Sequence, residues 1–579
     1  MKNNITNNVN QNYLDRVNLE DVEDALKFLD KADQNNNKEI SDTLTKPGII
    51  PEPFFIEKDE LWINVKGEGR LLCRQVPYII KKLNNIEDNT VSYILCWKDD
   101  NLTKTEVVSS IVLSVKKELL SLSEKGLGVN ENNYKQMISF FDKYLSENKI
   151  KQETMVNRLG HIKNGFIHPL ILNDIIIVPN DAGEKQILEA IQEKGTVESW
   201  RQEVLELVKP LSKSLFYLVA SFTAPLLHDF QIDSFIVDFS GHTSQGKTTL
   251  LRLSSTVWGT SKLINEWEST RVSIERKAAF LNSFPLFMDD TKKANPKQLE
   301  SVIYQFSGGR SRGRGSLKGI QKELTWRTIL LSTGESSILQ YTNGGGVAGR
   351  VVPINDEPFG KPSNEFMEKL YKGINNNYGV VGRVFIQKWM EIDPEYKESY
   401  KSTFYDLKNN YIKLAGSNEV LIRIASYYAI IHFVATLLNE LMDFNIDPTS
   451  FEGLFKVAGI ENREVDKPKQ LMEDILESLD SFRSSIHYGY FEPTQINGLF
   501  DKSNRFYLTT SYTNKFLGPE AKAIKHEWLK RGYIIPSSSD GKESQTKKLG
   551  GRAYKAIEVN QDLLTELGFD FSDTGEKDY

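Results

Sequence analysis

Gly241-His-Thr-Ser-Gln-Gly-Lys-Thr248 lies between a short apolar run, 235–239, and a stretch of helical periodicity, 249–258. A strand, the pattern GxxxxGK[ST] and a helix, in that order, form the loop that holds the phosphates of a nucleotide. Its glycines let several backbone N–H groups point at one anion, and the amino end of the helix adds partial positive charge. The sequence therefore predicts an α/β core built around a P-loop.

The P-loop assigns roles to its own side chains. Lys247 is placed to reach the β- and γ-phosphates, and the Thr248 hydroxyl is placed to ligate Mg²⁺. We therefore expect ATP and Mg²⁺ as cofactors. The expected nucleotide-binding residues of the loop are Gly241, Ser244, Gly246, Lys247, Thr248 and Thr249.

An apolar run that ends in two acids, Pro285-Leu-Phe-Met-Asp-Asp290, indicates the partner motif of a P-loop. The first acid, Asp289, would hold the metal through water, and the second, Asp290, would polarise the attacking water. Motor ATPases more usually have Glu at the second position. Asp is one methylene shorter, which bears on the rate of hydrolysis and not on nucleotide binding. The alternative is a strand that ends in solvated acids.

A third apolar strand, 326–334, ends in two hydroxyl-bearing residues, Ser332 and Thr333. At the carboxyl edge of the sheet these side chains would lie beside the γ-phosphate. Either hydroxyl could orient the attacking water, and we take Thr333 as a candidate catalytic residue.

The segment 308–319, between the acidic strand and the third strand, is rich in Gly and Arg and contains no acid. Basic residues that alternate with small ones are typical of a loop that follows a phosphodiester backbone. A solvated loop, or a contact with a neighbouring subunit, is the alternative. The predicted DNA contacts here are Arg310, Arg312, Arg314 and Lys318.

The segment Asn343-Gly-Gly-Gly-Val-Ala-Gly349 also matches GxGxxG, the dinucleotide-binding pattern. We reject that interpretation, because a strand follows the segment and no helix N-terminus would face a pyrophosphate. Arg350, directly after this loop, suits an arginine finger that acts on the γ-phosphate of a neighbouring subunit. A structural arginine at the edge of a strand is the alternative.

The order of these motifs resembles a known family. GHTSQGKTT, VWG, PLFMDD, the Arg- and Gly-rich loop, WRTILLSTGE and GGGVAGRVVPI follow one another along the chain. Together they resemble the mobile-element proteins labelled "superfamily II helicase and inactivated derivatives", above all the helicases of staphylococcal cassette chromosomes. These are AAA+ ATPases related to the MCM replicative helicases. The resemblance extends over most of the chain after residue 51 and is strongest at 235–354.

The resemblance implies a P-loop AAA+ core with a helical lid that works as a hexameric ring. ATP would bind between subunits, with Asp289 and Asp290 from one side and Arg350 from the other. The basic loop 310–318 would correspond to the hairpin that lines the MCM pore. Arg423 falls on a lid helix where a second nucleotide-sensing arginine would lie, although an ordinary arginine of an amphipathic helix gives the same pattern.

Changes in composition and hydrophobic periodicity along the chain divide it into five parts. We expect an N-terminal tail or helix at 1–50, an α+β accessory domain at 51–196 and the ATPase core at 197–360. A helical lid at 361–470 and a winged-helix-like domain at 471–579 follow. The winged helix rests on helices followed by a hairpin with a basic tip, and such domains bind either DNA or proteins. Its predicted DNA contacts are Lys542, Lys547, Lys548 and Arg552.

Composition excludes several classes of protein. The 579 residues carry 72 Lys and Arg against 78 Asp and Glu, a formal net charge of -6, so no overall basic footprint indicates nucleic acid. With only Cys73 and Cys96, the chain has neither a disulfide scaffold nor a CxxC zinc site. Its seven histidines are scattered without an HExxH pattern, so we expect no metal site made of His and Cys.

The sequence favours a cytoplasmic protein. Its longest apolar run, 214–227, contains Pro225 and is shorter than the about 20 residues that a membrane span needs. The N-terminus has no apolar core of the kind that a signal peptide requires.

These observations predict an ATP-dependent DNA helicase that serves the replication of a mobile genetic element. Its expected partners are single-stranded DNA, duplex origin DNA, further copies of itself, and a primase or polymerase of the same element. Two alternatives stay open: a P-loop ATPase that remodels or loads other proteins on DNA, and an inactivated derivative that binds DNA and nucleotide as a switch. A P-loop kinase is disfavoured, because the sequence offers no acceptor site.

Overall fold

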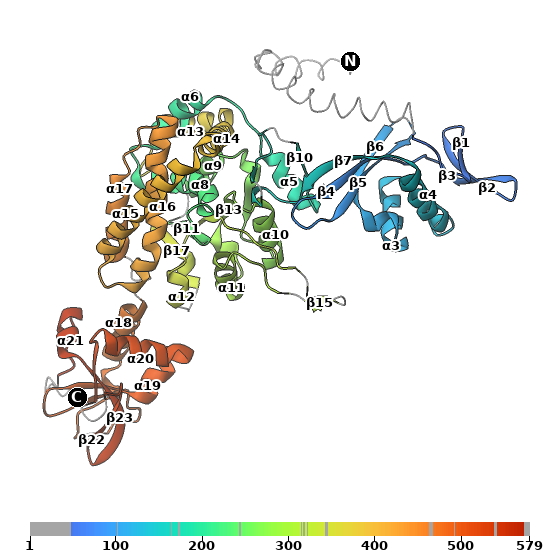
Figure 1. Ribbon diagram of the computed structural model, residues 1–579. Helices are drawn as coiled ribbons and strands as arrows, with labels where there is room; N and C mark the ends of the chain where they lie inside the picture. Colours follow the sequence, from blue (N-terminus) through green and yellow to red (C-terminus); the bar gives the residue numbers. More distant parts are fainter. Residues whose placement is uncertain are drawn as a thin grey trace, which may run out of the picture. The chain divides into compact units, whose positions relative to one another are not determined.

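The computed structural model describes residues 48–572, apart from 101, 164, 172–173, 243–244, 314, 317–318, 321, 342–344, 462–466, 491 and 538–540. The helix predicted near the N-terminus lies outside these residues. Contacts divide the chain into two units. The first comprises residues 1–158 and 172–180, and the second comprises residues 159–171 and 181–579 (Figure 1).

The first unit is built on two sheets. An antiparallel sheet joins β1 (Phe54–Glu57), β2 (Glu60–Val65) and β3 (Glu68–Cys73). A mixed sheet has the order β10-β7-β4-β5-β6 and is covered by α3 (Lys116–Leu120) and α4 (Tyr134–Glu147). The strands of the mixed sheet are β4 (Tyr78–Asn85), β5 (Val91–Asp99), β6 (Leu102–Ser109), β7 (Lys151–Val156) and β10 (Ile175–Ile177).

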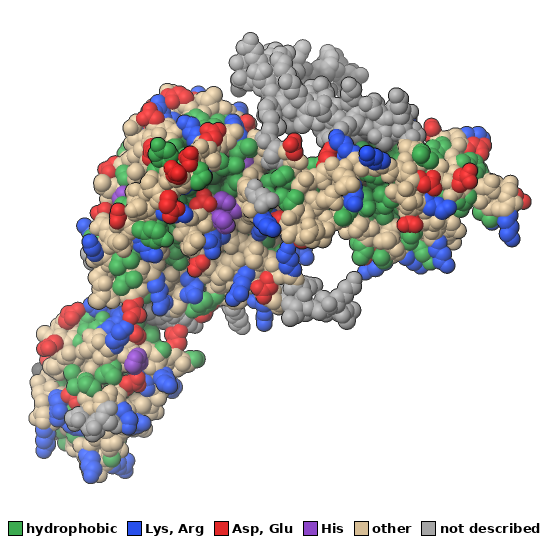
Figure 2. All heavy atoms as spheres, viewed as in Figure 1, with side chains coloured by type: hydrophobic (Ala, Val, Ile, Leu, Met, Phe, Trp, Pro, Cys, Tyr) green, Lys and Arg blue, Asp and Glu red, His purple; other side chains and the backbone are tan. Residues whose placement is uncertain are grey.

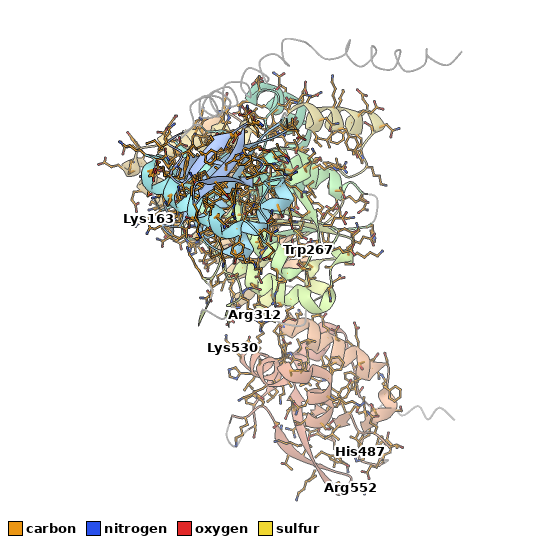
Figure 3. The ribbon with its side chains drawn as sticks, turned by 90° about the vertical axis from the view of Figure 1, so that its right-hand side faces the viewer. Lys163, Trp267, Arg312, His487, Lys530 and Arg552 are labelled. Carbon is orange, nitrogen blue, oxygen red and sulfur yellow. The ribbon has the colours of Figure 1, made fainter. Side chains whose placement is uncertain are left out.

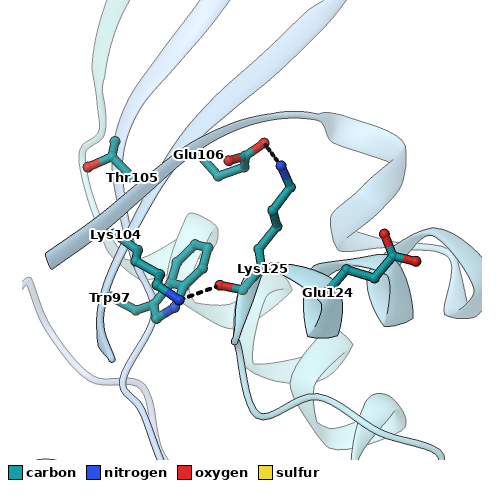
Figure 4. Close-up of a pocket in the computed structure, with 6 residues that line it drawn as sticks. All are labelled: Trp97, Lys104, Thr105, Glu106, Glu124 and Lys125. Atoms are coloured by element: carbon teal, nitrogen blue, oxygen red, sulfur yellow. Dashed lines mark hydrogen bonds and ion pairs between the residues drawn. The ribbon is translucent and has the colours of Figure 1, made fainter. Parts of the chain in front are cut away.

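A pocket of about 390 Å³ opens in the first unit beside Trp97 (Figure 4). The two lysines that line it both have partners. Lys104 Nζ lies 3.1 Å from the carbonyl oxygen of Lys125, and Lys125 Nζ lies 3.6 Å from Glu106. Both ammonium groups are therefore already held by groups of the protein itself.

A parallel sheet forms the centre of the second unit. Its order is β12-β13-β16-β11-β17, and every neighbouring pair is parallel. All six residues of β11 are buried, as expected for a parallel strand covered on both faces, and this explains its continuous apolar sequence. The strands are β11 (Phe235–Ser240), β12 (Ile264–Glu266), β13 (Leu286–Asp289), β16 (Ile329–Gly334) and β17 (Val351–Asn355).

Helices cover this sheet (Figure 1). The buried helix α8 contacts β11 and β16, and α9 contacts β13 and β16. These parts confirm an α/β fold with a parallel sheet and helices. The helices around the sheet are α8 (Ser212–Thr223), α9 (Lys247–Ser255), α10 (Arg271–Leu281), α11 (Pro296–Ser307) and α12 (Gly345–Ala348).

A helical region follows the sheet. Its central helix, α16 (Glu419–Met442), packs against α8, α15 and α17. By length and composition this helix could span a membrane, but 67% of its most apolar window is buried inside the protein, as in the core of a soluble protein. The other helices are α13 (Asn364–Asn376), α14 (Val380–Glu391), α15 (Pro394–Ala415) and α17 (Thr449–Glu461).

The C-terminal part has its own core, which includes Trp528, Leu508 and Ile557. Its sheet has the order β18-β19-β20-β23-β21, and β22 pairs with β23. The helices are α18 (Lys467–Asp480), α19 (Thr510–Leu517), α20 (Ala521–Lys530) and α21 (Gln561–Leu567). The strands are β18 (Ile486–His487), β19 (Gly498–Phe500), β20 (Phe506–Thr509), β21 (Ile534–Ile535), β22 (Gln545–Leu549) and β23 (Arg552–Val559).

Candidate nucleotide-binding site

The P-loop follows the carboxyl end of β11, at the edge of the sheet where the other parallel strands also end. Gly246 caps α9 with a φ of 90°, a conformation that glycine adopts at little cost. A Cβ there would lie 2.9 Å from the ring of Phe359, and a Cβ at Gly241 would lie 2.6 Å from the carbonyl oxygen of Asp356. The two outer glycines of the motif are therefore needed for close packing as well as for the turn.

Lys247 bends back across the loop. Its ammonium donates to the carbonyl oxygens of Gly241 at 2.9 Å and His242 at 2.5 Å. Burial lowers its pKa below the ordinary lysine value, while the negative charges of Glu335, Asp289 and Asp290 act in the opposite direction. An arriving phosphate would therefore find a cation already held at the mouth of the loop.

Asp289, at the end of β13, connects the start of α9 with the end of β16. Its carboxylate accepts from the Thr248 hydroxyl, with oxygen distances of 3.3 and 3.0 Å, and from the Thr333 hydroxyl at 2.5 Å. Because β16 lies between β11 and β13, Thr333 is inserted between the P-loop and the acidic strand. These groups could hold a hydrated Mg²⁺ beside a γ-phosphate.

The structure distinguishes between Ser332 and Thr333, the two residues whose hydroxyls could orient the attacking water. Ser332 is fully buried, and its hydroxyl accepts from the indole N–H of Trp267 at 3.1 Å. Its carbonyl oxygen accepts from the Tyr217 hydroxyl at 2.9 Å. Side chains alternate along a strand, so Ser332 supports the sheet while Thr333 faces Asp289.

Asp290 has a φ of 63°, which is unusual for a residue other than glycine and turns the chain sharply after β13. Its carboxylate lies 3.8 Å from the ammonium of Lys293.

Glu335 is a third acid near the loop, and the sequence motifs did not indicate it. It directly follows β16, and its negative charge acts to raise the pKa of Lys247. Its position after the two hydroxyls, at the end of an apolar strand, could have identified it.

Tyr371 is a second residue that the sequence did not indicate. It lies on α13, where its hydroxyl is 3.0 Å from the Thr249 hydroxyl, and its side chain is 41% exposed. Thr249 lies in the first turn of α9, so Tyr371 contacts this helix directly after the phosphate-binding loop.

Arg350 lies at the amino end of the parallel strands, which we call the amino edge, opposite the carboxyl edge with the P-loop. Its carbonyl oxygen accepts from the backbone N–H of Ile236 at the start of β11, whereas Lys247 follows the end of that strand. A strand of this length spans about 20 Å at about 3.3 Å per residue. The guanidinium donates to the Gly346 carbonyl oxygen and lies 4.7 Å from the ring of Tyr304 on α11. Arg350 is therefore separated from the P-loop of its own chain.

Arg423 shares this amino edge with Arg350. A Cβ at Gly349 would lie 2.8 Å from Cδ of Arg423, so the arginine side chain packs directly against the residue before Arg350. The predicted site residues thus form two groups at opposite edges of one sheet. The first group holds Lys247, Thr248, Asp289, Asp290 and Thr333. The second holds Arg350 and Arg423.

The basic loop forms a hairpin that leaves the amino edge. Arg310 bridges Thr325 at its base, and β14 (Gly315–Ser316) pairs with β15 (Gly319–Ile320) farther out. Both Arg310 and Arg312 are exposed, and Arg312 lies at the lower end of the part with the parallel sheet in Figure 3. Of the predicted contact residues, Arg314 and Lys318 lie outside the described residues, as does Ser244 of the P-loop.

The predicted basic tip of the C-terminal hairpin is arranged differently from our expectation. The tip is the turn at Gly550 and Gly551. Lys547 and Lys548 lie on β22, Arg552 begins β23, and Lys542 precedes β22. Figure 2 shows Lys and Arg side chains gathered at the end of this part.

Individual residues of this hairpin differ in their surroundings. Lys547 contacts the buried carboxylate of Asp501, and Arg552 donates to Glu492 at 2.6 Å. Lys542 and Lys548 are exposed. Of the four predicted contact residues, Lys547 therefore has the most evident structural role.

Comparison with solved structures extends these observations. The structure of SCCmec type IV Cch, an active helicase, matches 89% of this chain and 99% of its own chain with a TM-score of 0.66 at 17% sequence identity. The C-terminal region of NrS-1 matches 83% of this chain and 96% of its own at 10% identity, but its TM-score of 0.30 is too low to establish a shared fold. No curated protein matches the chain in sequence.

A family model also matches part of the chain. Residues 54–326, which include the P-loop and the acidic strand, match the family described as a domain of unknown function, DUF927. The resemblance to the cassette chromosome helicases that the motifs predicted is therefore confirmed: over most of its length this chain has the fold of the SCCmec helicase.

Proposed function

We propose that the protein is an ATP-driven DNA helicase with an MCM-like AAA+ core. One observation carries the proposal: Lys247, Thr248, Asp289 and Thr333 meet at the carboxyl edge of a parallel sheet. This edge provides a phosphate-binding loop, a carboxylate for a hydrated Mg²⁺ and a hydroxyl for the attacking water. ATP and Mg²⁺ are the cofactors that this chemistry requires.

Hydrolysis at this edge requires a second subunit. The arginines suited to stabilise a γ-phosphate, Arg350 and Arg423, lie at the opposite edge of the same sheet. A head-to-tail neighbour would bring its amino edge to the P-loop, and repetition of such a contact forms a ring when the rotation between subunits closes. This supports a hexamer in which each site is shared by two chains.

DNA would pass the basic hairpin at 310–325. The hairpin leaves the sheet at the same edge as Arg350, and α11 connects the two features, because Tyr304 of this helix lies under the guanidinium. Nucleotide state at the interface could thus change the position of the hairpin. The helices 364–461 would act as the lid and the C-terminal part as a winged helix, in a cytoplasmic protein that serves replication of a mobile element.

The proposal is tested by three measurements on the full chain. We expect ATP hydrolysis that single-stranded DNA stimulates, together with separation of a forked duplex. Negative-stain imaging with ATP should show rings with six-fold symmetry. A protein that hydrolyses ATP without unwinding would instead be a remodelling or loading ATPase.

The second candidate function is an inactivated switch that binds nucleotide and DNA. The observation that favours it is Asp290, whose shorter carboxylate and φ of 63° differ from an ordinary strand-end Glu. Nucleotide binding without hydrolysis under any DNA condition would select the switch over the helicase.

Charge removal at the hairpin should weaken DNA binding. We expect the double variant Arg310→Ala, Arg312→Ala to reduce the slope of log K against log salt by about 1.4, because each phosphate contact on a single strand contributes about 0.7. Fluorescence anisotropy with labelled single-stranded DNA over a range of salt concentrations measures this slope.

The matched control for this double variant removes two exposed positive charges elsewhere in the second unit, Lys262→Ala and Arg276→Ala. We expect the control to keep the slope of the unmodified chain. Equal slopes in the hairpin variant and the unmodified chain would exclude the hairpin as a DNA contact.

A further inference from the structure

The hairpin β8 (Gly160–Ile162) and β9 (Gly165–Ile167) is fixed to the core of the second unit. The side-chain amide of Asn282 donates to the carbonyl oxygens of Leu159 at 2.9 Å and His161 at 2.6 Å. The backbone N–H of His161 donates to the Ser283 hydroxyl at 3.1 Å. The backbone at His161 is therefore held on both sides, and its imidazole projects from a rigid support.

Three groups able to bind a metal converge at this imidazole. His228 and Asp229 directly follow the 3-10 helix η4 (Ala224–Leu227), which continues α8. One ligand atom from each of His161, His228 and Asp229 lies within 4.8 Å of the others. Asp229 Oδ1 is 3.9 Å from His161 Nε2 and 3.7 Å from His228 Nδ1, so one carboxylate oxygen faces both rings.

The carboxylate of Asp229 is oriented by a neighbour. Its other oxygen, Oδ2, accepts from the indole N–H of Trp389 at 2.7 Å. This bond turns Oδ1 toward the two imidazoles, in the way that outer hydrogen bonds orient metal ligands in proteins. The carbonyl oxygen of Pro225 accepts a hydrogen bond from His161 Nε2, 2.9 Å away. Zn²⁺ would take the place of this proton, and the carbonyl oxygen would then be a fourth donor at the same place.

We propose that His161, His228 and Asp229 bind a Zn²⁺ ion that joins the β8–β9 hairpin to the end of α8. Metal–ligand bonds of about 2.0–2.1 Å in a tetrahedron place neighbouring ligand atoms about 3.3 Å apart. The distances of 3.9 and 3.7 Å from Asp229 Oδ1 to the two rings exceed this value by about half an ångström. The ring nitrogens of His161 and His228, which lie within 4.8 Å of each other, would also have to approach. The rings of His161 and His228 are stacked, with centroids 4.3 Å apart and 17° between their planes. The exposed His228 ring would therefore have to turn well out of the stack before both ring nitrogens point at one ion.

The donor set selects the class of metal. Two imidazoles and one carboxylate suit Zn²⁺, Ni²⁺ or Cu²⁺, whereas Mg²⁺ and Ca²⁺ prefer sites made entirely of oxygen. Zn²⁺ accepts tetrahedral sites with three protein ligands and a fourth position filled by water or a further oxygen. The role would be structural, because the ion would connect two segments that are far apart in the sequence.

Calorimetric titration of the full chain with Zn²⁺ in excess Mg²⁺ tests this inference. Excess Mg²⁺ competes with Zn²⁺ for sites made entirely of oxygen, such as the carboxylates beside the P-loop, and leaves a site with imidazole ligands accessible to Zn²⁺. We expect one Zn²⁺ per chain, a rise in the melting temperature on binding, and loss of both in His228→Ala. His228 is suited to the test, because its side chain is 56% exposed and its removal leaves the core intact.

Two further variants complete the design. Trp389→Phe keeps an aromatic ring but removes the bond to Asp229, and we expect it to weaken Zn²⁺ binding by about 10–100-fold. His526→Ala, which removes an exposed histidine of α20, should bind Zn²⁺ like the unmodified chain. The inference is overturned if the unmodified chain binds no Zn²⁺, or if His228→Ala binds it equally well.

Discussion

Lys247→Ala should lower ATP hydrolysis by about 10²–10³-fold, the usual loss when one donor to transition-state charge is removed. Charge spreads over the γ-phosphoryl oxygens as the bond to the leaving group breaks, and the lysine ammonium is placed to meet it. DNA unwinding should fall with hydrolysis, because translocation depends on it. Initial-rate ATPase assays and a forked-duplex assay measure the two effects.

The fold should survive this substitution. The ammonium of Lys247 donates hydrogen bonds only to two carbonyl oxygens of the loop itself. Its removal therefore leaves no buried carboxylate without a hydrogen-bond donor. Lys262→Ala is the matched control, since it removes an exposed lysine from the same unit. Unwinding that persists in Lys247→Ala would show that the motor assignment is wrong.

The arrangement at the carboxyl edge follows from the sequence with little further information. Parallel strands place their carboxyl ends at one edge, so a P-loop after one strand and acids after another must lie close together. The contact between Asp289 and Thr248 is the expected consequence. The choice between Ser332 and Thr333 is different, because it depends on which face of β16 the Trp267 indole occupies.

Other features depend on tertiary packing that local patterns do not report. His161 and His228 are distant in the sequence and have no common motif, yet their rings stack at 4.3 Å. The expectation that the scattered histidines form no metal site rested on spacing along the chain, which says nothing about such a pair. The sequence pattern likewise predicts an exposed position for Lys547 on a strand. Only the tertiary fold brings its ammonium to Asp501.

Arg350→Ala should also abolish hydrolysis, by about 10³-fold or more if it acts as an arginine finger. The alternative, a structural arginine, has support in its bond to Gly346 and its contact with Tyr304. Thermal unfolding separates the two roles, because a structural arginine would lower the melting temperature. The control Arg276→Ala removes an arginine whose side chain is 56% exposed, and it should keep both activity and stability.

Mixing two inactive variants gives the decisive result. In a ring of Lys247→Ala and Arg350→Ala chains, an Arg350→Ala subunit has an intact P-loop, and a Lys247→Ala neighbour supplies an intact arginine. Random assembly of equal amounts restores about a quarter of the interfaces, so hydrolysis should return to about that fraction of the unmodified rate. If each site lay within one chain, no mixture would recover activity. The separation of Lys247 and Arg350 at opposite edges of one sheet leads us to expect recovery.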